Sequence, residues 1–222
     1  EVYANPKPLI EDGFVRISHY NKSGKLHTPD SKIPSLIDTL KKEVKYHKRG
    51  SFHRENGPAC IYYFEDASIE YEEYYINGKL NREDGPANIC YNKNGSIESE
   101  NYYVNGKYHR EDEPSIIVYY ENGYIKYEEY YINGKKHREE GSAHIRYYED
   151  GSIKYEEYYI NGKAHKEEGP ALISYSENGH ISYEVYYLNG KKHREDGPAY
   201  IEYNDDGSIE YESYYINGEK QN

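Results

Sequence analysis

The sequence predicts a mainly β protein, built as an elongated array of antiparallel β-hairpin repeats in a twisted single-layer sheet or solenoid, with one short N-terminal helix. Three observations predict this. A 28-residue stretch recurs in constant register, and its cleanest copy is Ala143–Pro170. Each copy carries an Asn-Gly step, which favours a tight hairpin turn. The residues between the turns are rich in Ile and Tyr, which favour strands. A fixed period of this size indicates stacked repeats that contact mainly their neighbours.

The repeat divides the chain into two regions. Residues 59–222 hold five full repeats and a truncated one, and residues 1–58 hold degenerate copies that cap the array. In the degenerate region, Glu11-Asp12-Gly13 keeps the spacing of a turn, and Ser31–Pro58 is again 28 residues long. The repeats begin at Ala59, Ala87, Ser115, Ala143, Ala171 and Ala199.

One stretch of the degenerate region departs from the repeat pattern. Apolar side chains stand at helical spacing after the start signal Pro34-Ser35. These are Leu36, Ile37, Leu40 and Val44. We therefore expect one short amphipathic helix that covers the open edge of the first strand, as the terminal repeats of such arrays commonly do.

Within a regular repeat, turn chemistry predicts the pairing. Glu149–Gly151 fits a three-residue hairpin loop with Gly in the left-handed position. Simple alternation then places five side chains on one buried face: Ile145, Tyr147, Ile153, Tyr155 and Tyr159. It places four on a mostly charged face: Arg146, Lys154, Glu156 and Tyr158. Asn161-Gly162 turns the chain again, and His165 is expected to begin a third strand or an extended arm. On this pairing, Tyr155→Ala should destabilise the fold far more than Tyr158→Ala.

Composition limits the classes of partner. The chain has a formal net charge of −12, and its 36% hydrophobic residues include 32 Tyr. Nucleic acids and anionic lipid surfaces both require clustered Lys and Arg, so we expect neither as a partner.

No apolar stretch is long enough to span a membrane, and no signal-peptide pattern is visible. Cys60 and Cys90 occupy different positions within their repeats and are expected to be free thiols in a reducing compartment. We expect the cytoplasm, or the host cytoplasm or virion for a viral protein, rather than secretion.

The string Tyr155–His165 resembles the MORN repeat in its MORN-2 variant. Tyr155, Tyr159, Gly162 and His165 fall on the family's tyrosine, aromatic, turn glycine and histidine. The period is longer than the family's, Glu157 replaces the inner glycine, and Lys166 replaces the glycine after the histidine. The string His-Arg-Glu-Asp-Gly-Pro-Ala is similar to arrays encoded by giant DNA viruses. The resemblance implies a scaffold or interaction module without chemistry of its own.

Three columns of polar residues are candidates for chemistry, and each has a structural interpretation. A histidine column contains His53, His109, His137, His165 and His193, and Asn81 interrupts it. Equivalent atoms two or three strands apart cannot share one metal ion, so we predict no shared metal site and a His that is packed against a neighbouring Tyr or hydrogen-bonded in the turn. The paired carboxylates recur in nearly every repeat, as in Glu72/Glu73, Glu128/Glu129 and Glu156/Glu157, which favours a solvated charged face over a catalytic pair. The Arg-Glu-Asp runs at 82–84 and 194–196 are expected to form ion pairs between adjacent loops.

A row of tyrosines is the best candidate for a binding site. It consists of Tyr74, Tyr102, Tyr130, Tyr158, Tyr186 and Tyr214. Aromatic rows on a repeat surface serve as anchors for partners, so we predict that these side chains are exposed. The alternative is that they brace both faces of a single-layer sheet.

These observations predict a non-catalytic interaction or scaffold protein with an extended, acidic, tyrosine-rich surface. We expect no cofactor, no metal and no enzymatic activity. The expected partner is another protein, a second copy in a homodimer included. One alternative is a glycan or cell-wall binding array, because aromatic hairpin repeats also occur in such modules. A toxin-neutralising protein, similar to an antitoxin, is a further alternative.

Overall fold

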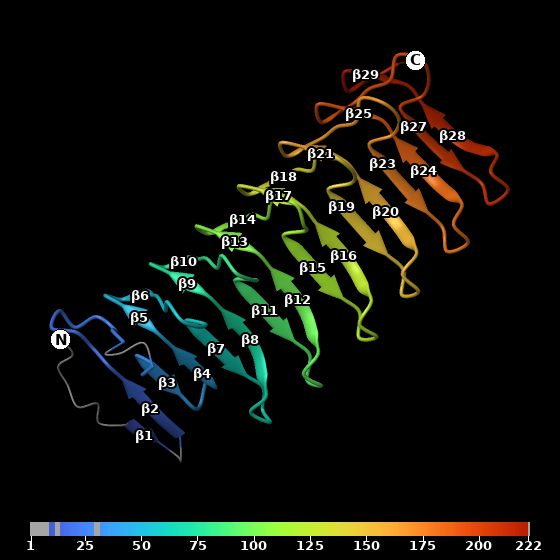
Figure 1. Cartoon of the computed structure of the whole chain (residues 1–222). Helices are drawn as coiled ribbons and strands as arrows, with labels where there is room; N and C mark the ends of the chain where they lie inside the picture. Colours follow the sequence, from blue (N-terminus) through green and yellow to red (C-terminus); the bar gives the residue numbers. More distant parts are fainter. Residues whose placement is uncertain (1–8, 12–13, 29–31, 222) are drawn as a thin grey trace. The chain divides into compact units, whose positions relative to one another are not determined.

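The computed structural model describes residues 9–11, 14–28 and 32–221, and every regular element in these ranges is a β-strand (Figure 1). Asp12, Gly13 and Ser31, which the sequence assigned to degenerate repeats, lie outside the described residues. The chain divides into two compact parts, 1–107 and 108–222, which are described separately below. No helix in the described ranges is long and apolar enough to cross a membrane.

The long strands of the first part are hydrogen-bonded neighbours in chain order, and every pair is antiparallel. They are β1 (Leu9–Glu11), β2 (Phe14–Ser18), β3 (Leu36–Asp38), β4 (Glu43–Lys45), β7 (Cys60–Tyr63), β8 (Ile69–Glu73), β11 (Asn88–Tyr91) and β12 (Ile97–Asn101). The short strands are β5 (His47–Lys48), β6 (Ser51–Phe52), β9 (Tyr75–Ile76), β10 (Lys79–Leu80) and β13 (Tyr103–Val104), with β14 (Lys107–Tyr108) at the division between the parts.

The second part repeats this arrangement, again with antiparallel neighbours in chain order. Its long strands are β15 (Ile116–Tyr119), β16 (Ile125–Glu129), β19 (His144–Tyr147), β20 (Ile153–Glu157), β23 (Leu172–Tyr175), β24 (Ile181–Val185), β27 (Tyr200–Tyr203) and β28 (Ile209–Ser213). Its short strands are β17 (Tyr131–Ile132), β18 (Lys135–Lys136), β21 (Tyr159–Ile160), β22 (Lys163–Ala164), β25 (Tyr187–Leu188), β26 (Lys191–Lys192), β29 (Tyr215–Ile216) and β30 (Glu219–Lys220).

A regular repeat therefore contains four strands, which form a long hairpin and a small one. β19 pairs with β20, the chain makes the small hairpin β21–β22, and it returns as β23 beside β20. Within each part, Figure 1 shows the small hairpins at one end of the long strands and the long-hairpin turns at the other. His165 does not begin a strand, because the third strand of the repeat ends at Ile160 and the fourth at Ala164.

The turn predictions are confirmed. Gly151 has a φ of 87° and ends a three-residue loop, closed by the hydrogen bond from the amide of Tyr148 to the carbonyl of Ser152. Asn161 and Gly162 have φ values of 51° and 82°, which is the left-handed pair that a two-residue type I′ turn requires. Mainly β hairpin architecture thus follows from turn residues that tolerate positive φ.

The predicted N-terminal helix is wrong. Residues 36–38 and 43–45 form the hairpin β3–β4, in which Ile37 pairs with Val44. Leu40, which the helix would have buried, is exposed in the connecting turn. The neighbouring strands β2 and β7 offer backbone partners on both sides of this hairpin, and a strand satisfies more of those groups than an isolated helical turn.

The hairpin β3–β4 belongs to a shortened repeat that begins at Ser35. Its amide donates to the carbonyl of Lys45 ten residues on, whereas the amide of Ala59 donates to Glu73 fourteen residues on. The long-hairpin turn of this repeat is therefore four residues shorter than in the regular repeats. The segment caps the array by continuing the sheet, and not by covering its edge with a helix.

A β-bulge changes the predicted faces of the sheet. Tyr147 pairs with Ile153 as expected, but Arg146 pairs with Tyr155, which leaves Lys154 as the extra residue. A bulge of one residue reverses which face the following side chains occupy. Every long hairpin from residue 59 onward has the same shift at the same place, whereas β3–β4 pairs without one. The prediction of one apolar and one charged face is therefore wrong, and both faces mix tyrosines with carboxylates.

We define the two faces by the strand pairing in the Ala143 repeat. The first face carries Ile145, Tyr147, Ile153, Glu156 and Tyr158, and the second face carries His144, Arg146, Tyr155, Glu157 and Tyr159. The alanines that open the repeats are completely buried, and the isoleucines two residues later are buried from Ile89 onward. The alanines are Ala59, Ala87, Ala143, Ala171 and Ala199.

Candidate functional site

The first face exposes an apolar stripe near the long-hairpin turns. In the Ala143 repeat it consists of the cross-strand pair Tyr147 and Ile153, of which Ile153 is 41% exposed. Because each long strand contributes one such residue, neighbours follow at about the spacing of strands, roughly 4.8 Å. We call this the Tyr–Ile stripe. It contains Tyr63, Ile69, Tyr91 and Ile97 in the first part, and Tyr119, Ile125, Tyr147, Ile153, Tyr175, Ile181, Tyr203 and Ile209 in the second.

The sequence pointed to these residues but placed them in the wrong environment. Ile153 was expected to be buried, yet it is exposed to water, and Ile209 in the last repeat is 53% exposed. The pairing of Ile153 with Tyr147 is the predicted one, so alternation gave the correct face but not its burial. A single exposed isoleucine is ordinary, whereas one in the same place in successive repeats forms a patch.

The tyrosines of the stripe are held by carboxylates of the preceding repeat. The hydroxyls of Tyr91, Tyr147, Tyr175 and Tyr203 donate to Glu72, Glu128, Glu156 and Glu184 over 3.2, 3.0, 2.8 and 3.1 Å. Burial, followed by the charge of Glu184, raises the pKa of Tyr203 to about 12, so its hydroxyl stays a donor at neutral pH. The carboxylates were expected on a solvated face. They instead connect adjacent repeats, and Glu128 is buried.

The predicted tyrosine row lies beside these carboxylates on the same face, but most of it is not exposed. A cation eight residues further along covers four of the six rings, and another covers the equivalent Tyr46. Arg54, Arg82, Arg138, Lys166 and Arg194 lie over Tyr46, Tyr74, Tyr130, Tyr158 and Tyr186 at 3.8, 4.1, 3.9, 3.7 and 4.1 Å from the ring centroids. Tyr130 is only 8% exposed, and within the predicted row only Tyr214, at 44%, is exposed. The arginine or lysine of the loop therefore occupies the ring face that a ligand would use.

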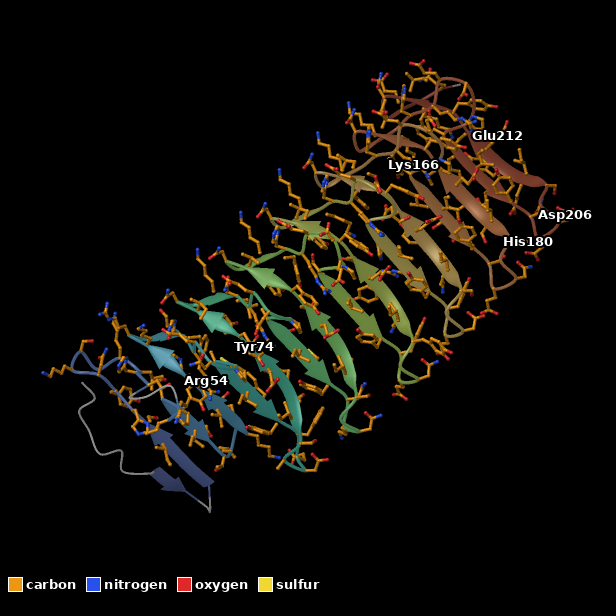
Figure 2. All side chains as sticks on the ribbon, in the orientation of Figure 1. Arg54, Tyr74, Lys166, His180, Asp206 and Glu212 are labelled. Atoms are coloured by element: carbon orange, nitrogen blue, oxygen red, sulfur yellow. The ribbon has the colours of Figure 1, made fainter. Side chains whose placement is uncertain are left out.

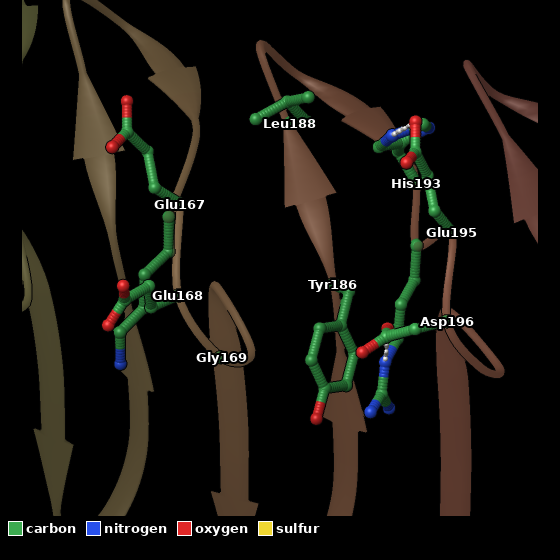
Figure 3. Close-up of a pocket in the computed structure, with 10 residues that line it drawn as sticks. Glu167, Glu168, Gly169, Tyr186, Leu188, His193, Glu195 and Asp196 are labelled. Atoms are coloured by element: carbon green, nitrogen blue, oxygen red, sulfur yellow. Dashed lines mark hydrogen bonds and ion pairs between the residues drawn. The ribbon is translucent and has the colours of Figure 1, made fainter.

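Grooves lie between successive loops at the small-hairpin end of the first face. Figure 3 shows one, in which Tyr186 and Leu188 form the floor and acidic residues of two loops form the walls. Two equivalent grooves have Tyr74 with Ile76, and Tyr130 with Ile132, as floors. Their cavity volumes are about 520, 720 and 500 Å³, enough for a large side chain of a partner. Carboxylates outnumber cations in each.

The loop arginines do not form the predicted ion pairs between adjacent loops. Arg194 pairs with Asp196 of its own loop at 3.0 Å, as Arg82 does with Asp84. The Arg194 guanidinium, through its hydrogen bond and its charge, lowers the pKa of Asp196. Arg194 also donates to the carbonyl of Pro198, so it is fixed in place over the tyrosine. Glu167 and Glu168 on the other wall are exposed (Figure 3).

Of the two roles expected for the histidine column, the structure shows the hydrogen bond in the turn. The Nδ1 atoms of His53, His109, His137, His165 and His193 accept hydrogen bonds from the amides of Asn77, Asn133, Asn161, Asn189 and Asn217, at 3.1 to 3.2 Å. Each bond joins one repeat to the next small-hairpin turn. His27 is a further member, missed because its spacing to His53 is shorter, and it accepts from Arg49. In the described part of the chain, no group of three or more His, Cys, Asp or Glu side chains is arranged to hold a metal ion.

The link made by the histidine column requires a side-chain hydrogen-bond acceptor at this position. Asn81 supplies one, because its Oδ1 atom accepts from the amide of Asn105 at 2.9 Å. We expect His165→Asn to keep the link to Asn189 at neutral pH, and His165→Leu to lose it at a cost of about 1 kcal/mol. Hydrogen exchange of the Asn189 amide should therefore be faster in His165→Leu than in the wild type or in His165→Asn. Equal exchange rates in His165→Leu and the wild type would contradict this role.

The second face carries a polar cluster that the sequence analysis did not identify. His144, which is buried, lies between Glu129 and Glu157, at 3.7 and 3.6 Å. Lys136 pairs with Glu129 at 3.1 Å, and the Nε of Arg146 donates to His144. Because the imidazole is enclosed by its own partners, this cluster stabilises the second face.

Both cysteines are free, as expected, and burial raises the pKa of the Cys60 thiol to about 12, which makes it unreactive.

A scan against models of protein families gives no match to the chain, and no curated protein matches it either.

Proposed function

We propose that the chain is a non-catalytic repeat protein that binds another protein along its first face. The Tyr–Ile stripe is the observation that carries this proposal. It places an apolar pair at the same position of successive repeats, where folding leaves the isoleucines exposed to water. Aromatic and aliphatic side chains held rigidly on strands lose little entropy on binding, which is typical of interaction surfaces.

The charges on the same face support a partner of defined chemistry. Toward the small hairpins on the same face, the grooves have apolar floors and acidic walls, as between Tyr186, Leu188, Glu168 and Glu195. An extended segment that alternates apolar and basic side chains would contact the stripe with the former and the loop carboxylates with the latter. The partner segment would cross the long strands and meet equivalent contacts in successive repeats.

A glycan array is a weaker alternative in this geometry. Sugar rings stack on open aromatic faces, and at Tyr74, Tyr158 and Tyr186 a loop cation covers the ring. A toxin-neutralising role belongs to the same binding class as the proposal and predicts the same face.

Selection of a random peptide library against the immobilised chain tests the proposal. We expect enrichment of extended peptides that alternate basic with apolar residues. The double variant Ile153→Ser, Ile181→Ser should weaken the binding of such a peptide at least about tenfold, since each isoleucine loses apolar contact area. Arg146→Ser, an exposed position on the second face of the same repeat, is the matched control and should leave affinity unchanged.

Two results would contradict the proposal. One is a selection that enriches no peptide, and the other is equal affinity of the isoleucine variant and the wild type. A glycan array probed with the same protein separates the alternative, because saccharide binding that survives the isoleucine replacements would favour it.

A further inference from the structure

Two rows of exposed charge, opposite in sign, run along the second part of the chain. A lysine follows the Asn-Gly step of every small hairpin in this part except the last, which has Glu219, and an acidic residue opens each long-hairpin turn. The lysine row consists of Lys135, Lys163 and Lys191, and the carboxylate row consists of Glu121, Glu149, Glu177 and Asp205. All seven side chains are exposed, and in the part of the chain that the structure describes none of them belongs to an ion pair.

Direct packing of successive turns sets the spacing of the lysine row. A Cβ atom added at Gly162 would lie 3.8 Å from the Cβ of Lys135, and one at Gly190 would lie 3.5 Å from that of Lys163. Each small-hairpin turn therefore contacts the preceding one. Successive lysines are separated by one repeat, which is two long strands or about 10 Å.

The carboxylate row has the same period because its turns are linked in the same way. The side-chain amide of Asn122 donates to the carbonyl of Glu149 in the next turn over 3.1 Å. The two rows occupy opposite ends of the same strands. Figure 1 shows the small hairpin β21 at one end of β20, and Figure 2 shows His180 and Asp206 at the turn end of the second part.

We propose that a second copy of this chain packs alongside the first, with its carboxylate row against the lysine row. A partner without this period could neutralise one lysine, whereas a second copy offers a carboxylate for each. The contact joins two different surfaces, so it leaves both outer rows free and forms open assemblies. It uses the ends of the strands and does not rest on the proposed role of the first face.

The association should be weak and sensitive to salt, because exposed ion pairs contribute little singly and are screened. We would measure the mass in solution by sedimentation, at protein concentrations up to about 1 mM. At about 20 mM salt, the average mass should rise above the 26.2 kDa of one chain, and at about 300 mM salt the dissociation constant should be at least about tenfold higher.

Two charge-reversal variants test which residues are responsible. The lysine-row variant carries Lys135→Glu, Lys163→Glu and Lys191→Glu. The carboxylate-row variant carries Glu121→Lys, Glu149→Lys and Glu177→Lys. Each alone should remain a single chain at low salt, and a mixture of the two should associate again, because the reversed rows are complementary to each other.

If association depended only on the net charge of the chains, the carboxylate-row variant should behave differently. Three replacements that each add two positive charges bring the formal net charge from −12 to −6, which would favour association if net charge alone mattered. Loss of association in this variant supports the pairing of rows. A wild type that stays a single chain at low salt, or single variants that associate as strongly as the wild type, would overturn the proposal. So would a mixture that fails to associate while both variants keep the wild-type circular dichroism spectrum.

Discussion

Replacing Tyr130 with alanine is expected to destabilise its repeat by about 3 kcal/mol, as large-to-small changes at buried aromatic positions do. Tyr130 is 8% exposed and lies beneath the guanidinium of Arg138, 3.9 Å from the ring centroid. The change removes ring packing and the cation–π contact together. It also leaves the charge of Arg138 over a cavity.

Tyr214 provides a matched control in the same column. Its side chain is 44% exposed, and its hydroxyl donates to Glu212 at the surface, so Tyr214→Ala should cost less than about 1 kcal/mol. Hydrogen exchange should report the difference locally. In Tyr130→Ala, protection should fall in residues 115–142 and much less in distant repeats. Similar losses in the two variants would show that burial does not decide the role of this column.

The same geometry changes the expectation for Tyr155 and Tyr158. The sequence assigned Tyr158 to an exposed charged face and predicted a small effect of its removal. In the structure Tyr158 lies 3.7 Å from the Nζ of Lys166, and Tyr155 is half-buried on the opposite face. Both tyrosines therefore stabilise the sheet, and their alanine variants should have comparable effects.

Acidification is expected to destabilise the first part through His47, whose imidazole is 6% exposed. Burial, followed by the charge of Lys45, lowers the pKa of His47 to about 4 from 6.5. Between these values the unfolded chain binds a proton that the folded chain does not. The free energy of unfolding therefore rises with pH across this window and is lost as the pH falls from about 6.5 to about 4. The full loss from this residue is about 3 kcal/mol.

His47→Tyr is the variant that isolates this effect, because regular repeats have tyrosine at the equivalent position, as in Tyr75. The Nδ1 of His47 contacts the hydroxyl of Ser35 at 2.7 Å, and its ring packs on Phe52 at 4.6 Å. Urea unfolding and hydrogen exchange of residues 35–58 should be measured from pH 7 to pH 4. All other groups are the same in both proteins, so only the difference between the two pH profiles belongs to His47. Parallel profiles would contradict the prediction.

The sequence by itself determined the repeat, its boundaries and its turns. Residues such as Asn161, Gly162 and Gly151 tolerate positive φ, and this local property sufficed to predict both hairpin turns. The period alone also predicted that the histidine column shares no single metal ion, because residues one repeat apart lie too far from each other. These features depend on short stretches of chain or on the repeat period, and both can be recognised in a single sequence.

Only the tertiary structure decided which side chains face outward. The extra residue Lys154 in the bulge reverses the following side chains, and neither composition nor alternation reveals it. The segment at 36–44 fits helical spacing, but partners on β2 and β7 make it a hairpin. The tyrosine row has the composition of a binding surface, yet a cation eight residues away covers most of it. Register, sheet neighbours and stacking depend on contacts between segments of the chain. In the folded protein the isoleucines of the stripe are exposed, and most tyrosines of the predicted row are covered.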